Sequence, residues 1–72
     1  MHYSMVIQWS DEDSTYVVSF PEWEATGDYY VHTHGDTYEE AVHNGQELLA
    51  DLIARAREDS KTLPAPQVFA TA

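Results

Sequence analysis

The sequence predicts an α+β fold: a three-stranded antiparallel sheet, one helix packed on it, and a short last strand. Two observations lead to this prediction. Runs of β-forming residues fill the first half of the chain, and a single long helical stripe of apolar residues follows them. Pro64 and Pro66 prevent the helix from continuing. The expected order is βββαβ, in one domain that spans residues 1–72.

The first two predicted strands form a hairpin. Residues 3–9 alternate between two faces, and residues 15–20 have the same β-forming composition. The acidic run between them, residues 10–14, is short enough to be a turn. One face of the first strand carries its larger apolar side chains, Tyr3, Met5, Ile7 and Trp9.

The segment after the hairpin is predicted to leave the sheet and return to it. Pro21 ends the second strand because proline cannot donate to a ladder. Residues 22–28 are expected to form a loop, residues 29–33 a third strand, and residues 67–71 the short last strand.

The helix has a clear beginning and a clear buried face. Thr37 and Glu40 have the spacing of a capping box, in which each side chain satisfies a free amide at the helix start. Gly45 lies inside the apolar stripe, where it lets the helix backbone approach the sheet closely. The stripe comprises Ala41, Val42, Gly45, Leu48, Leu49, Leu52, Ile53 and Ala56.

Charge and size constrain the partners. Thirteen acidic residues against three basic ones give a net charge of -10, which disfavours direct binding to nucleic acid or to an anionic membrane surface. The same charge would steer a basic partner toward the chain. The alternative is that the charge only keeps a small protein soluble. A chain of 72 residues without cysteine is expected to self-associate, as a homodimer or tetramer. No signal peptide or membrane span is recognised, so the expected location is the cytoplasm.

The candidate chemistry is weak. His32 and His34 point to one side of a strand, but a metal site needs further ligands, for which His43 or His2 is the nearest source. Hydrogen-bonded strand histidines explain the pair more simply. No nucleophile stands in a recognisable motif and no glycine-rich phosphate loop is present. We therefore expect no catalytic residue, no metal and no cofactor, and hence no enzyme; a metal-dependent hydrolase is a minor alternative.

The aromatic residues point to an interface. Trp9, Trp23, Tyr29, Tyr30 and Tyr38 outnumber what one helix can cover on so small a sheet, and aromatic side chains are enriched at protein–protein contacts. The alternative is that each lies at the rim of the single core. From charge and expected exposure, the predicted partner-binding residues are Trp9, Asp11, Asp13, Glu22 and Trp23.

The chain resembles the HicB antitoxin family in three stretches: YSMVIQWSDEDSTYVVSFPE at 3–22, HGDTYEEAVHNGQELL at 34–49 and LPAP at 63–66. Members show a strand hairpin that ends in a Pro-acid pair, a G-D/S-T-x-E-E-A helix start and a proline-rich exit. The resemblance covers Tyr3 to about Val68. It implies a partial ribonuclease H-like fold, but the first strand, residues 4–8, lacks the acid that ribonuclease H chemistry needs.

The resemblance also implies a function. HicB antitoxins of type II toxin–antitoxin pairs bind HicA, a small basic toxin that cleaves messenger RNA, and occlude its catalytic histidine. The sequence therefore predicts a HicB-like antitoxin that neutralises such a toxin. The alternative is a stand-alone oligomeric HicB-like adaptor with another partner and no toxin. Because the chain stops at Ala72, no appended DNA-binding domain is expected.

Overall fold

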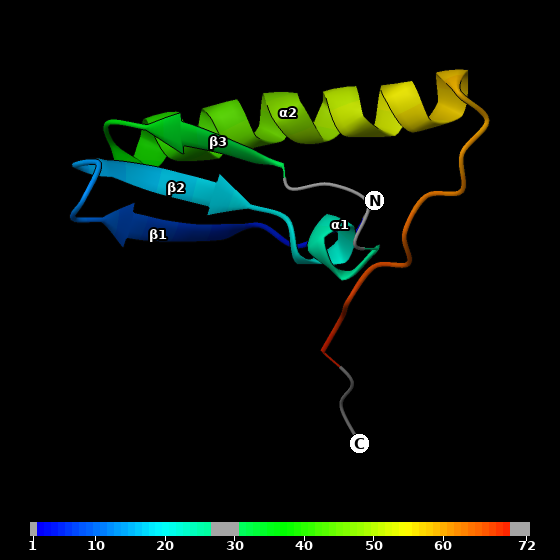
Figure 1. The fold of residues 1–72 in the computed structure, drawn as a ribbon, viewed down its shortest axis with the longest axis horizontal. Coiled ribbons are helices and arrows are strands. Elements are labelled where there is room, and N and C mark those ends of the chain that lie inside the picture. The colour runs from blue at the N-terminus through cyan, green and yellow to red at the C-terminus, as the bar shows by residue number, and fades with distance from the viewer. Residues whose placement is uncertain (1, 27–30, 70–72) are drawn as a thin grey trace.

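Three antiparallel strands form one sheet in the order β1-β2-β3, and a long helix, α2, packs along it (Figure 1). The computed structural model describes residues 2–26 and 31–69. The α+β class and the βββα order predicted from the sequence are confirmed. The elements are β1 (Val6–Ser10), β2 (Thr15–Ser19), α1 (Pro21–Thr26), β3 (His32–Gly35) and α2 (Tyr38–Glu58).

The strand register separates a covered face from an open face. Ile7 pairs with Val18, and Val18 pairs in turn with Thr33, so these residues share the face that α2 covers. The predicted hairpin is confirmed, although β1 begins at Val6 rather than at residue 3. The third strand continues to Gly35, past the predicted end; residues 29–30 of that prediction lie outside the described residues.

α2 begins where the capping box predicts. The Thr37 hydroxyl accepts a hydrogen bond from the Glu40 amide at 3.1 Å. The Glu40 carboxylate reaches back to the Asp36 amide at 3.2 Å, one residue before the usual partner. The first contact satisfies an amide that a helix start leaves free, the second holds the residue before the cap, and the negative charge of Glu40 also suits the positive end of the helix dipole.

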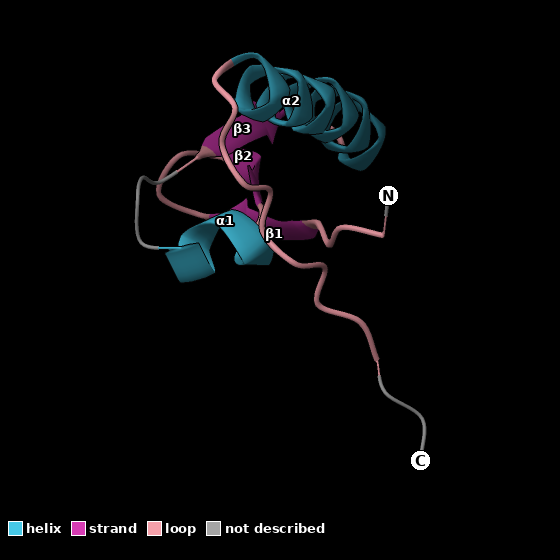
Figure 2. Cartoon of the chain, turned by 90° about the vertical axis from the view of Figure 1, so that its right-hand side faces the viewer, coloured by secondary structure: helices cyan, strands magenta, loops and turns pink. Residues whose placement is uncertain are grey.

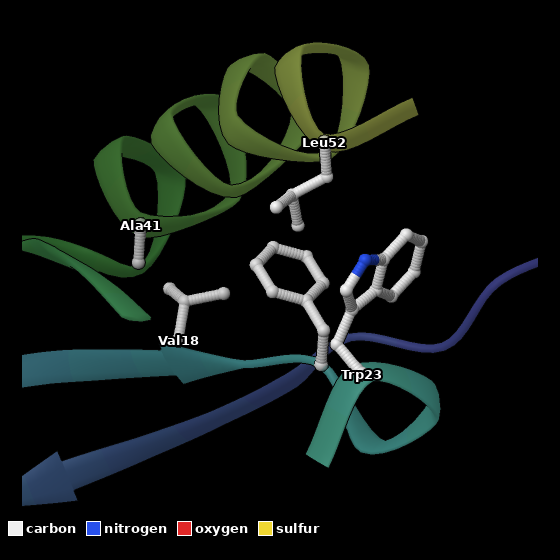
Figure 3. Close-up of a cluster of buried hydrophobic side chains, with 5 residues drawn as sticks. Val18, Trp23, Ala41 and Leu52 are labelled. Carbon is white, nitrogen blue, oxygen red and sulfur yellow. The ribbon is translucent and has the colours of Figure 1, made fainter. Parts of the chain in front are cut away.

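The core lies between α2, the covered face of the sheet and α1 (Figure 3). Val18 of β2, Leu52 of α2 and Trp23 of α1 point toward one another in this close-up. Each comes from a different element, so burial of apolar surface holds the layers together. The fully or nearly buried apolar residues are Val18, Phe20, Trp23, Ala41 and Leu52.

Gly45 allows the close approach of helix and sheet that the sequence predicts. A Cβ added there would lie 2.7 Å from the Met5 sulfur and 3.0 Å from Cγ1 of Val18. Both are side-chain atoms, one from β2 and one from the segment before β1. The absence of a side chain at Gly45 therefore brings the helix backbone close to β2 and to the segment before β1.

α1 occupies residues that the sequence analysis assigned to a loop, and that prediction is wrong. Pro21 ends β2 and also begins α1, because the first position of a helix needs no amide donor. The amides of Trp23 and Glu24 both donate to the Phe20 carbonyl at 3.1 Å. Burial of the Trp23 indole then fixes this short turn against the core. Of the predicted loop, Gly27 and Asp28 lie outside the described residues.

The predicted last strand is also absent over residues 67–69, the part of it that the structure describes. Pro64 and Pro66 lack amide donors, and the Gln67 amide donates to the Glu22 carboxylate at 2.9 Å instead of to a strand. The segment is anchored beside the N-terminal residues, where the Tyr3 hydroxyl donates to the Pro64 carbonyl at 2.6 Å. Residues 70 and 71 of the predicted strand lie outside the described residues.

Candidate functional site

Two turns meet at one end of the sheet and carry the most distinctive surface of the protein (Figure 1). One is the β1–β2 turn at residues 11–14, in which Ser14 adopts a left-handed backbone with φ of 51°. The other joins β3 to α2. The Thr15 hydroxyl donates to the Gly35 carbonyl at 2.9 Å and so ties the two turns together.

Three aromatic rings connect these turns. The Trp9 and Tyr16 rings, which are cross-strand partners, meet edge to face with centroids 5.1 Å apart. Tyr16 meets Tyr38, the first residue of α2, in the same way at 5.8 Å. Trp9 is 51% exposed and Tyr38 is 58% exposed, so the outer rings present large apolar faces to the surroundings. Edge-to-face packing stabilises such rings and holds them in place.

Acidic side chains lie at the same end of the sheet as the aromatic rings, and one of them contacts a ring. The Trp9 indole N–H donates to Asp11 Oδ1 at 2.8 Å, which fixes both the ring and the carboxylate. The Asp13 amide donates to the Ser10 hydroxyl at 3.3 Å, which holds the turn. We call this region the hairpin-end surface; it comprises Trp9, Asp11, Asp13, Tyr16, Asp36 and Tyr38.

No lysine or arginine balances the charge of the hairpin-end surface. The three basic residues of the chain, Arg55, Arg57 and Lys61, lie in or just after the last turn of α2. At 1.5 Å per residue, Arg55 is about 25 Å along the helix from Tyr38, well beyond a Debye length at physiological salt. The hairpin-end surface is therefore an unneutralised anionic region that contains exposed aromatic rings.

The structure divides the five predicted partner-binding residues into two groups. Trp9, Asp11 and Asp13 are exposed and lie together on the hairpin-end surface. Glu22 and Trp23 are only 1% and 5% exposed, so the exposure expected for them is wrong. Trp23 packs edge to face on Tyr3 at 4.7 Å, inside the molecule. Both lie on α1, which the sequence analysis did not predict, and α1 packs them against the N-terminal and C-terminal segments.

Glu22 is a structural carboxylate. It accepts hydrogen bonds from the Ser4 amide, 3.1 Å from each oxygen, and from the Gln67 amide at 2.9 Å. Burial alone would raise the pKa of this carboxyl, but the backbone hydrogen bonds from Gln67 and Ser4 favour the charged form and lower the pKa below its ordinary value. One buried charge thus joins the N-terminal segment, α1 and the C-terminal segment.

This carboxylate predicts how stability changes with pH. A group whose pKa is lower in the folded chain stabilises the fold fully above its unfolded pKa, and the contribution is lost as the pH falls through the folded value. For Glu22 the loss is expected to begin near pH 4.5, the ordinary value, and to continue below it. Urea unfolding of the wild type and of Glu22→Gln should therefore give a stability difference that is constant above about pH 5.5 and shrinks below 4.5. A difference that grows on acidification would contradict this role.

Sequence reasoning missed three members of the surface, Tyr16, Asp36 and Tyr38, and the two aromatic residues were missed in different ways. Tyr38 was recognised as an exposed aromatic but was not assigned to the binding set, and Tyr16 was not considered. The hairpin register provides the signal for Tyr16, since a five-residue pairing opposes it to Trp9. Tyr29 and Tyr30, the other aromatics of that prediction, lie outside the described residues.

None of the histidines is among the residues that define the hairpin-end surface. His32 and His34 share one face of β3, as predicted, and His43 Nε2 lies 3.0 Å from a Glu47 carboxylate oxygen on the surface of α2. Among residues 2–26 and 31–69, no three histidine or acidic side chains gather as metal ligands.

Comparison with protein-family models, with curated proteins and with solved structures finds no match to this chain. The HicB resemblance thus remains a prediction from the sequence motifs. Over the described part of the chain, neither helix combines the length and the apolar character that crossing a bilayer requires.

Proposed function

We propose that this protein is a HicB-like antitoxin that neutralises a small basic, messenger-RNA-cleaving toxin by covering its active site. It acts in the cytoplasm, catalyses no reaction itself and self-associates as a homodimer or tetramer. The hairpin-end surface is the observation that carries this proposal, because it combines exposed aromatic rings with acids that no basic residue of the chain neutralises.

The chemistry of this surface suits a cationic protein partner. Arginine side chains stack on the faces of tryptophan and tyrosine and form charged hydrogen bonds with carboxylates, and Trp9 and Asp11 offer both groups side by side. The Trp9 side chain is held by Asp11 and Tyr16, so its ordering adds little to the entropic cost of binding. A partner anchored there is expected to be basic.

The same charge explains inhibition. A toxin that cleaves RNA needs a cationic surface for the phosphate backbone. An anionic protein that occupies this surface excludes the substrate by competing for the same basic groups. The association rate should therefore fall as the salt concentration rises.

The second candidate, a stand-alone oligomeric HicB-like adaptor without a toxin, is favoured by a separate observation. Val68 and Phe69 are 67% and 102% exposed and lie on the C-terminal segment rather than on the hairpin-end surface. The chain thus has a second apolar region, which suits association with something other than a basic toxin.

The test uses a small basic protein encoded beside the gene, purified and titrated with the antitoxin candidate by calorimetry while RNA cleavage is followed in parallel. Trp9→Ala and Asp11→Lys should each weaken binding by about 10- to 100-fold, the loss typical of a central anchor residue. Both variants should also release RNA cleavage at concentrations where the wild type inhibits it.

Asp51→Lys is the matched control, because it makes the same charge reversal at an exposed position of α2 away from the hairpin end. Its affinity should stay within about threefold of the wild type. Equal losses for Asp11→Lys and Asp51→Lys would show that only net charge matters and that the surface is wrongly assigned. The absence of binding to any neighbouring basic protein would reject the antitoxin and leave the adaptor.

A further inference from the structure

The C-terminal segment carries the most exposed apolar side chain that the structure describes. Phe69 is 102% exposed and Val68 is 67% exposed. Figures 1 and 2 both show this part of the chain leaving the sheet and the helices. Residues 62–69 contain no charged side chain. We call Gln67–Phe69 the tail; its composition is that of a strand, yet it pairs with no strand of its own sheet.

The direction of the tail is fixed by its first residue, Gln67, and by the residues before it. The Tyr3 hydroxyl holds the Pro64 carbonyl, and the Glu22 carboxylate holds the Gln67 amide. Pro64 and Pro66 restrict the backbone between these contacts, so the segment is stiff as well as anchored. Val68 and Phe69 therefore directly follow an anchored residue, and both side chains remain exposed.

β1 offers the matching partner. It is an edge strand, and within residues 2–26 and 31–69 no strand pairs with its outer side. The tail starts beside the segment that leads into β1, where the Ser4 hydroxyl donates to the Gln67 carbonyl at 3.2 Å. Ser4, Gln67, Val68 and Phe69 together line an open cavity of about 210 Å³. An edge strand with free amides and carbonyls is a template for an extended segment of another chain.

The opposite edge, β3, is a poorer partner. The Asn44 side chain of α2 donates to the His34 carbonyl at 2.7 Å, and α2 follows β3 directly and packs along it. Helix residues thus already use part of the β3 backbone. The observations favour β1.

We propose that the tail of one copy pairs with the outer edge of β1 in a second copy, and reciprocally, to form a two-fold symmetric dimer. This proposal rests on the self-association included in the proposed function and identifies the segments that cause it. A closed, reciprocal exchange satisfies both edges and both tails at once, whereas a one-way contact would build an open chain of molecules.

The surface available suits a small but stable interface. A phenylalanine side chain brings about 200 Å², and Val68 with the strand backbone brings the tail to roughly 300 Å². With the matching area on β1 and the second, symmetry-related tail, the total is about 1,200 Å², the lower end of the range for specific interfaces. Because each copy carries a charge of -10, added salt should strengthen this dimer, whereas it should weaken binding to a basic toxin.

Sedimentation equilibrium of the full chain tests the proposal. The wild type should sediment as a dimer, and Phe69→Asp should weaken self-association by at least about 10-fold, because it places a charge in the apolar contact. Gln46→Glu is the matched control: it adds the same charge at an exposed position of α2 and should shift the dissociation constant by less than about threefold. A wild-type dimer that Phe69→Asp leaves intact would overturn the tail exchange but keep self-association. A monomeric wild type would reject both.

Engineered cysteines test which chain the tail pairs with, since the native chain has none. Gln8→Cys is combined with Val68→Cys in one double variant and with Phe69→Cys in another. Neighbouring residues of an extended tail point to opposite faces of the sheet, so only one of the two can lie on the same face as residue 8. Oxidation should give a disulfide-linked dimer for one of them. An internal disulfide in a monomer would show that the tail returns to its own β1 and would overturn the proposal. Gln8→Cys with Ala50→Cys, an exposed site on α2, should give only background linkage.

Discussion

Replacing Gly35 with alanine is expected to destabilise the fold by about 3 kcal/mol, the upper range for overpacking of a tight contact. Gly35 is buried where β3 turns into α2. A Cβ there would lie 2.6 Å from the Cα of Ala41 and 2.8 Å from the carbonyl carbon of Glu40. These are backbone atoms in the first turn of the helix, so no side-chain rotation relieves the clash. For a chain this short the loss is a large part of the total stability.

Urea unfolding followed by circular dichroism measures this effect, and Gly45→Ala is its matched control. At Gly45 the close atoms belong to the side chains of Met5 and Val18, of which the methionine can move. Alanine also gains about 1 kcal/mol of helix propensity over glycine in a helix interior. Gly45→Ala should therefore change the unfolding free energy by less than about 1 kcal/mol. A loss of unfolding free energy at Gly35 as small as the change at Gly45 would show that the first turn of α2 does not lie so close to Gly35.

Trp23→Ala is expected to cost about 3–5 kcal/mol, the range for removing a large buried aromatic side chain. Trp23 contacts Tyr3 and Phe20, and its burial holds α1 against the core. The same substitution at Trp9, which is half exposed, should cost about 1 kcal/mol, since less apolar surface returns to water.

Comparing Trp23→Ala with Trp9→Ala distinguishes a tryptophan that stabilises the fold from one that binds the partner. Thermal and urea unfolding should show the large loss only for Trp23→Ala, whereas partner affinity should fall for Trp9→Ala while its fold stays intact. If Trp23→Ala unfolds like the wild type but loses partner binding, the residue is at the surface after all, as the sequence analysis expected.

The long elements were predictable because their signals are local. α2 repeats its apolar residues at helical spacing over several turns, and Thr37 with Glu40 marks its start. The hairpin was predictable for the same reason, since alternation and a short polar turn lie within fifteen residues of sequence. For these two strands the structure differs from the prediction only at the strand ends, because pairing with the neighbouring strand decides where a ladder stops.

α1 escaped prediction because six residues are too few for helical periodicity to appear. Pro21 is compatible both with the end of a strand and with the first position of a helix, and local sequence does not separate the two. Burial of Trp23 against Tyr3 and Phe20 decides between them, and that contact is tertiary.

Two of the five predicted partner-binding residues, Glu22 and Trp23, depended on the same tertiary information. Asp11 and Asp13 were predicted correctly as exposed acids because a hairpin turn is exposed wherever the hairpin packs. Glu22 looked like a further surface acid, but its hydrogen-bond partners Ser4 and Gln67 lie 18 and 45 residues away. No local pattern reports such partners, so charge alone assigned a buried carboxylate to the surface.

The Glu22 carboxylate also brings the two ends of the described chain to one place, since Ser4 and Gln67 hydrogen-bond to the same side chain. β1 runs from that place to the hairpin turn, so the acids and rings around Trp9 face the opposite pole of the molecule (Figure 1). A fluorescent reporter or an affinity handle attached at Ser4 or Gln67 would therefore lie at this pole and leave the far pole open to a ligand.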